Sequence, residues 1–260
     1  MEAFALYRRY LAISIRAQLV YRATFVMKTV GHLLVTGIEF LAIWALFSRF
    51  GTLGGWSLHE VALLYGLIDV AFAIADATGR GFDKLGSLLR AGDFDRMLLR
   101  PCSVELQLLG HELQLMRIGR LSQGLVVLIW AGTAIAWSPA AVGLLLLSIA
   151  ATAALFLGIV VLQATSTFWT IQTLEVWNAF TYGGNYAAQY PMAIYQRWFQ
   201  RFFTAVIPLA LTSYIPGRAI LGRDPLDAIH MVAPLAGFGF LAITLGVFRL
   251  GIRHHASTGS

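Results

Sequence analysis

Long apolar runs separated by short charged stretches dominate the chain between residues 25 and 250. A helix rises about 1.5 Å per residue, so about 20 apolar residues are needed to cross a hydrocarbon layer of about 30 Å. Five runs reach that length with few charges, the third with a cytoplasmic extension: 25–48, 57–79, 106–137, 140–169 and 228–250. The pattern predicts an all-α polytopic membrane protein with a single transmembrane domain over 1–260.

The apolar stretch between residues 171 and 222 is interrupted by charges, two adjacent glycines and three prolines. Two layouts fit it: a fifth span at 172–190 followed by an outward re-entrant hairpin at 191–222, or a cytosolic 171–201 followed by a span at 202–221. We favour the hairpin, because prolines break a simple span and a broken backbone is tolerated where protein covers it. Four arginines would then face outward, although basic residues usually lie on the cytoplasmic side: Arg197, Arg201, Arg218 and Arg223.

Charge gives the expected orientation. Hydrophobic residues make up 58% of the chain and charged residues 12%, with a net charge of +6. Lysine and arginine are concentrated on the cytoplasmic side of membranes. Most of the 19 basic residues lie before the first span, between the second and third, or after the last: Arg8, Arg9, Arg16, Arg22, Lys28, Arg80, Lys84, Arg90, Arg96, Arg100, Arg117, Arg120, Arg249 and Arg253. We therefore expect both termini, including the tail 251–260, in the cytoplasm, which requires an even number of spans, six. This topology explains the positive charge without a nucleic-acid partner.

The segment before the first span is amphipathic. Residues 1–24 place their arginines on one side of a helical wheel, as in a helix that lies in the headgroup plane. The alternative is that these residues simply extend the first span into the cytosol. We expect a cytoplasmic interfacial helix.

The cytoplasmic segment 80–103 is charged but keeps apolar residues at helical spacing. Gly92 suits a C-terminal cap between two helical turns, and Pro101 ends the second. A solvated loop whose arginines only hold the topology is the simpler alternative. A mere tether needs no apolar face, however, and Phe94, Met97, Leu98 and Leu99 supply one. The pattern therefore favours an amphipathic element that binds a partner protein.

Two motifs carry a family resemblance that covers essentially the whole chain. They are "GDFDRMLLRP" at Gly92–Pro101 and "IPLALTSYIP" at Ile207–Pro216. Together with the basic N-terminal helix, they resemble ABC-2-type exporter permeases, in the six-span branch grouped with multidrug or antibiotic export.

The resemblance implies a division of labour with a separate ATPase. In that family the charged loop is the coupling helix, which docks on an ATPase subunit; in this chain it implies a set of ATPase-coupling residues: Phe82, Leu85, Asp93, Phe94, Asp95, Arg96, Met97 and Arg100. We expect Phe94 and Met97 to fill an apolar groove on the ATPase. The chain has no G-x-x-x-x-G-K-[ST] sequence. It is therefore expected to be no enzyme and to bind no cofactor, with ATP and Mg on the partner.

The resemblance also implies an assembly in the cell (plasma or inner) membrane. Six spans form half of a translocation pathway in that family. A second permease subunit, identical or related, and two ABC ATPase subunits are the implied partners, together with the lipid bilayer.

Ionisable residues inside the expected spans are the remaining candidates: His32, Glu39, Asp69, Asp76 and Glu175. A charge at the bilayer centre costs roughly 2.5 kcal/mol or more, so these groups should face protein or water. If the first two spans are antiparallel neighbours, His32 and Asp76 could form an ion pair, while Glu39 and Asp69 would share a proton or need another partner. Three roles remain open: polar links between helices, a wall of the substrate path, or the working groups of a proton-coupled secondary transporter or intramembrane enzyme.

Overall fold

The computed structural model describes the backbone of residues 2–170 and 174–254; the side chains of residues 2–8, 11, 174 and 175 lie outside the described part. Every regular element in these residues is a helix, and one isolated β-bridge joins Leu53 to Trp56. The predicted all-α class is confirmed.

Helix length supports four membrane crossings, or five if one bent pair of helices forms a single span. The four are α2 (Arg22–Phe50), α3 (Leu58–Thr78), α9 (Pro139–Ser166) and the α13–α14 unit (Ala228–Val232 and Leu235–His254). Two further helices, α8 (Ile118–Gly132) and α10 (Leu174–Ala188), have 15 residues each. That is short of the roughly 20 residues that cross a bilayer. By length, the described residues supply four or five spans, whereas the sequence predicts six.

Local sequence sets where the long helices begin. Ser57 and Glu60 form a capping box at the start of α3: the Ser57 N–H donates to the Glu60 carboxylate at 2.7 Å, and the Glu60 N–H donates to the Ser57 hydroxyl. Ser138 caps α9, whose first residue is Pro139. Such caps satisfy backbone N–H groups that have no partner within the helix.

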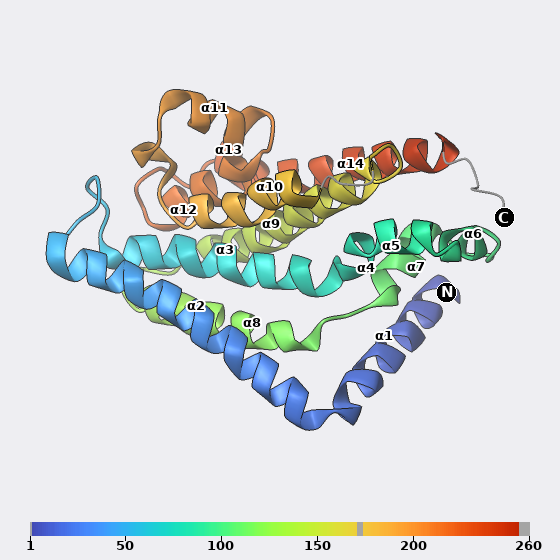
Figure 1. Cartoon of the computed structure of the whole chain (residues 1–260). Helices are drawn as coiled ribbons and strands as arrows, with labels where there is room; N and C mark the ends of the chain where they lie inside the picture. Colours follow the sequence, from blue (N-terminus) through green and yellow to red (C-terminus); the bar gives the residue numbers. More distant parts are fainter. Residues whose placement is uncertain (1, 171–173, 255–260) are drawn as a thin grey trace.

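α3 lies at the centre of the bundle, packed between α8 and α9 (Figure 1). α9 packs in turn on α14, and α2 packs on α8. Two glycines permit close helix contacts, because a Cβ on Gly66 would lie 2.9 Å from the Leu128 backbone and one on Gly237 would lie 2.1 Å from the Ala151 carbonyl oxygen. Small residues at helix interfaces are typical of membrane bundles.

One end of the molecule gathers α1 and the short helices between α3 and α8. They are α1 (Glu2–Val20), α4 (Arg80–Asp83), α5 (Leu85–Arg90), α6 (Asp93–Leu98), α7 (Val104–His111) and η1 (Leu115–Arg117). The start of α1 and the end of α14 lie at this same end (Figure 1). α1 is tied to the chain between α7 and η1, since the Leu113 N–H donates to Ser14 and the Leu115 N–H donates to Gln18, both at 3.0 Å.

The segment after α10 forms four short elements toward the opposite end (Figure 1). They are η2 (Met192–Ile194), α11 (Arg197–Ala205), the π-helical turn η3 (Ala210–Tyr214) and α12 (Ile215–Ile220). The chain bends by 84° between α11 and the η3–α12 unit, a geometry that fits a broken span as well as a re-entrant loop.

Candidate functional site

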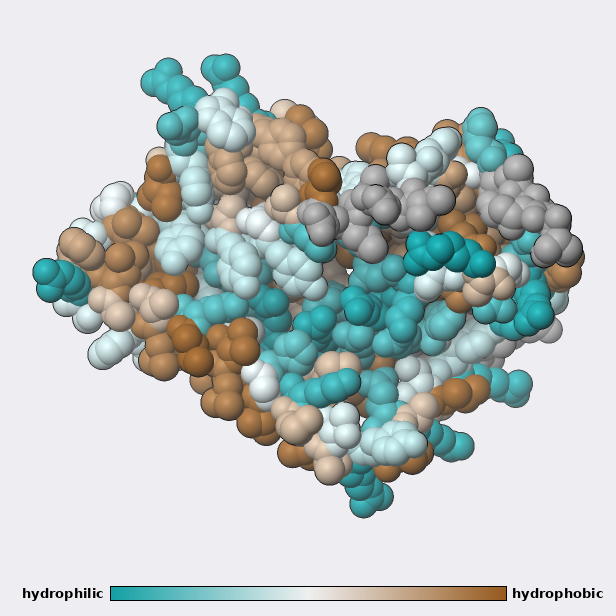
Figure 2. Space-filling view, viewed as in Figure 1, coloured by the Kyte–Doolittle hydropathy of each residue, from teal (hydrophilic) through white to brown (hydrophobic). Residues whose placement is uncertain are grey.

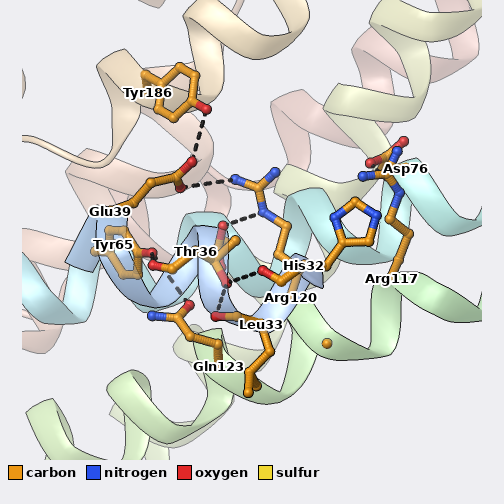
Figure 3. Close-up of polar contacts among 12 residues, drawn as sticks. His32, Leu33, Thr36, Glu39, Tyr65, Asp76, Arg117, Arg120, Gln123 and Tyr186 are labelled. Atoms are coloured by element: carbon orange, nitrogen blue, oxygen red, sulfur yellow. Dashed lines mark hydrogen bonds and ion pairs between the residues drawn. The ribbon is translucent and has the colours of Figure 1, made fainter. Parts of the chain in front are cut away.

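Three helices bring opposite charges together inside the bundle (Figure 3). Arg120 of α8 has its Nε 2.5 Å from Asp69 Oδ1 of α3, and both side chains are almost completely buried. Its Nη2 lies 3.9 Å from Glu39 Oε2 of α2. The guanidinium also lies over the ring of Phe72, 4.7 Å from its centroid. One arginine thus serves two carboxylates, and Arg120 is the other partner that the sequence required for Glu39 and Asp69.

The Glu39 side of this cluster reaches the surface. Tyr186 of α10 donates its hydroxyl to Glu39 Oε1 at 3.0 Å (Figure 3), and Tyr186 is 45% exposed. Figure 2 shows hydrophilic residues gathered across the middle of this face, above the apolar surface of α2. A carboxylate at membrane depth is costly against lipid, so this edge is suited to water or to another protein chain.

A second ion pair lies nearer the end that carries α4–α7. Arg117 Nε of η1 is 2.9 Å from Asp76 Oδ2 of α3 (Figure 3). The predicted His32–Asp76 ion pair is wrong: His32 lies near, but within the described residues the ion-pair partner of Asp76 is Arg117. A guanidinium keeps its charge at any physiological pH, so it balances the carboxylate permanently, whereas an imidazole would do so only when protonated.

Hydrogen bonds also join the three helices near the first ion pair. The Tyr65 hydroxyl of α3 lies 3.0 Å from the Thr36 carbonyl oxygen of α2 and 3.3 Å from Gln123 Oε1 of α8. Asp76 also borders a cavity of about 350 Å³ between α3, α9 and α10. Beside it, burial raises the pKa of Asp83, although Arg80 pairs with that carboxylate at 3.0 Å.

The arginine partners are the residues that sequence reasoning missed. It counts Arg117 and Arg120 with the cytoplasmic loop, but Arg120 lies within α8 and is 5% exposed. The available signal was spacing: the arginines are three apart at the start of one span, and the aspartates are seven apart in the preceding one. The side chain of Glu175, the fifth intramembrane candidate, lies outside the described residues.

The α4–α6 segment has an apolar interior of its own. Phe82, Leu85, Phe94 and Met97 are buried in a cluster with residues of α7, α9 and α14. Phe82 contacts the ring of Phe248 at 5.4 Å between centroids. The expectation that Phe94 and Met97 fill a groove on another protein is corrected by this packing, because their side chains are occupied within the chain itself.

Other residues of the segment face outward. Leu99 is 86% exposed and Leu98 41% exposed at the end of α6. Arg90, Arg96 and Arg100 are exposed around them, and Asp93 is half-exposed and pairs with Arg96 at 3.3 Å. Asp95 is partly buried. The turn between α5 and α6 is made by Gly92, whose φ of 71° is left-handed, as expected for the predicted cap.

Comparison with known proteins gives one match. The model of the ABC-2 family transporter proteins matches residues 33–259, which includes both ion pairs, the α4–α6 segment and the bent α11–α12 region. No curated protein and no solved structure matches the chain. Since the family model covers most of the chain, this protein belongs to the ABC-2 family of transporter proteins.

Proposed function

We propose that this chain is the permease subunit of an ATP-binding-cassette exporter and forms half of its translocation pathway. Family membership supports a transport role in a membrane. We infer that two separate ATPase subunits bind ATP and Mg, and that a second permease subunit completes the pathway. We also infer that the protein lies in the plasma or inner membrane, with both termini in the cytoplasm.

The observation that carries the proposal is the exposed tip of α6. Leu98 and Leu99 present apolar surface in a segment that also exposes three arginines, at the end of the molecule that holds α4–α7. Apolar side chains framed by charge are the usual anatomy of a protein interface. We place the ATPase contact at this tip.

The buried part of the segment could transmit motion from the docked tip of α6 to the membrane helices. Phe94 packs against Phe168, with ring centroids 5.6 Å apart, and Phe168 packs against Phe248 of α14 at 5.8 Å. Packed side chains transmit displacement because interiors are dense and nearly incompressible. In this scheme Leu98 and Leu99 dock, and Phe94 carries the motion into α9 and α14.

The alternative, a proton-coupled carrier, has less support. It requires intramembrane acids that bind and release protons during the cycle. Asp69 lies against the buried Arg120 and Asp76 against the largely buried Arg117, which favours charge-paired links between helices. An intramembrane enzyme would have to use the same acids, and Asp69 and Asp76 are engaged by arginines in the same way.

The test is retention of an ABC-type ATPase on the chain purified from its native membrane. Leu98→Ala/Leu99→Ala should reduce retained Mg-ATP hydrolysis about thirtyfold, as expected for about 2 kcal/mol lost at an interface. The control Leu226→Ala/Ile229→Ala removes two exposed apolar side chains at the other end and should leave the retained Mg-ATP hydrolysis unchanged. Phe94→Leu should keep the ATPase bound. Full retention by the double leucine variant would overturn the docking assignment.

A further inference from the structure

The four outward arginines fall into two kinds. Arg218 pairs with Asp224 at 2.7 Å. Arg223 pairs with Glu60 at 2.5 Å and lies over the Trp56 ring, 4.1 Å from its centroid. Their positive charge is balanced within the chain.

The other two, on α11, are not balanced. Arg197 and Arg201 are exposed, and no residue in the described part of the chain forms an ion pair or hydrogen bond with either guanidinium. They lie four residues apart, hence on one face of the helix. Trp198 is beside them and is 65% exposed. Two cations without a partner in the described part of the chain, at the end expected to face outward, call for a partner outside the chain, since basic residues usually avoid that side.

The opposite face of α11 anchors the helix. Phe203 is 5% exposed, Phe202 contacts Phe180 at 6.0 Å, and Phe199 stacks on Tyr195 at 4.6 Å between centroids. Because these aromatic rings pack inward, Arg197 and Arg201 are held outward. Figure 2 shows hydrophilic side chains projecting from the surface at the upper left, in the region of α11.

The composition and the bend of α11 suit a membrane surface. The η3–α12 unit packs on the long helix α9, and α11 is turned from that unit by 84°. A helix that turns away from such an apolar unit, with arginine and tryptophan on its exposed face, has the composition of an interfacial helix.

We propose that the α11 face formed by Arg197, Trp198 and Arg201 binds the phosphate headgroup of an anionic phospholipid, in the leaflet opposite α4–α7. Guanidinium groups bind phosphate oxygens in pairs, and tryptophan settles at headgroup depth. The charge complementarity is specific to this helix, since the neighbouring arginines already have acidic partners. The proposal does not depend on transport or on an ATPase.

The test is photo-crosslinking of the full chain in phosphatidylcholine nanodiscs. These contain a small fraction of phosphatidylglycerol with a diazirine near the top of one acyl chain, and labelling of the peptide over 194–206 is measured by mass spectrometry. Both leaflets of a nanodisc have the same lipids, so the result is independent of orientation. Arg197→Gln/Arg201→Gln should weaken labelling about thirtyfold, or about 1 kcal/mol for each arginine.

The control is Arg9→Gln/Arg16→Gln, which removes two exposed arginines of α1 and should leave labelling of 194–206 unchanged. All four substitutions are on the surface, where effects on folding are small. Unlabelled phosphatidylglycerol should compete with the probe, and phosphatidylcholine and inorganic phosphate should not. Equal labelling of both double variants, or equal competition by inorganic phosphate, would overturn the proposal.

Discussion

α2 and α3 are consecutive and similarly apolar, yet they occupy opposite environments. In its most apolar stretch α3 has 83% of its residues buried, and α2 only 17%. Hydropathy therefore identifies both as membrane-crossing helices but does not say which one forms the centre of the bundle. What distinguishes α3 is its pair of aspartates, because each must find a cation inside protein.

Asp69 of α3 and Glu39 of α2, the two acids that share Arg120, also differ in exposure. Asp69 is fully buried, whereas the Glu39 side chain is 22% exposed. The first lies in an interior ion pair, and the second lies at an edge, against Tyr186. This difference favours a structural role for Asp69 and a position facing the pathway or a second chain for Glu39.

The largest expected effect comes from removing Arg120 of α8, the cation that pairs with Asp69 of α3. Arg120→Leu leaves Asp69 buried without its partner, which costs about 3–5 kcal/mol. The double variant Asp69→Leu/Arg120→Leu removes both charges and should recover most of that loss. The free energy of unfolding in detergent micelles measures both. On α2, Ile38→Ala alters an exposed side chain and should change stability by less than about 0.5 kcal/mol. A single arginine variant as stable as the wild type would show that the ion pair contributes nothing.

An intermediate effect compares one glycine on each helix. A Cβ on Gly66 of α3 would lie 2.8 Å from the Leu128 Cβ, so Gly66→Ala should destabilise the α3–α8 contact by about 1–3 kcal/mol. Gly37 of α2 has no atom within 4 Å of such a Cβ. Gly37→Ala should therefore be neutral or slightly stabilising, since alanine favours a helix. The measurement is the thermal unfolding midpoint of each variant relative to the wild type. Equal shifts of the midpoint in the two variants would contradict the central position of α3.

The sequence predicts those features that depend on one segment at a time. The long apolar runs and the left-handed Gly92 follow from local patterns. The pairing of Arg120 with Asp69 depends on how α8 lies against α3. A rule that counts arginines as cytoplasmic markers hides that contact.

The α4–α6 segment shows the same limit. An apolar face on a charged loop predicts that something covers it, but not what. Phe94 packs on Phe168, which packs on Phe248 within the chain, so the amphipathic pattern reports internal packing. Leu98 and Leu99 belong to the same predicted apolar face but are exposed, because the exposure of each residue depends on the fold around it.

The smallest effect concerns the link between α2 and α3 themselves. Tyr65→Phe removes a hydroxyl that lies 3.0 Å from the Thr36 carbonyl oxygen, while the ring stays in place. Hydrogen bonds between membrane helices contribute about 0.6 kcal/mol on average, because the separated helices also find partners. We expect a loss of about that size in the free energy of unfolding. Tyr186→Phe, which removes the half-exposed hydroxyl beside Glu39, should leave stability unchanged because water can replace it. If Tyr65→Phe costs no more than Tyr186→Phe, packing alone holds α2 against α3, and the hydrogen bond adds nothing to it.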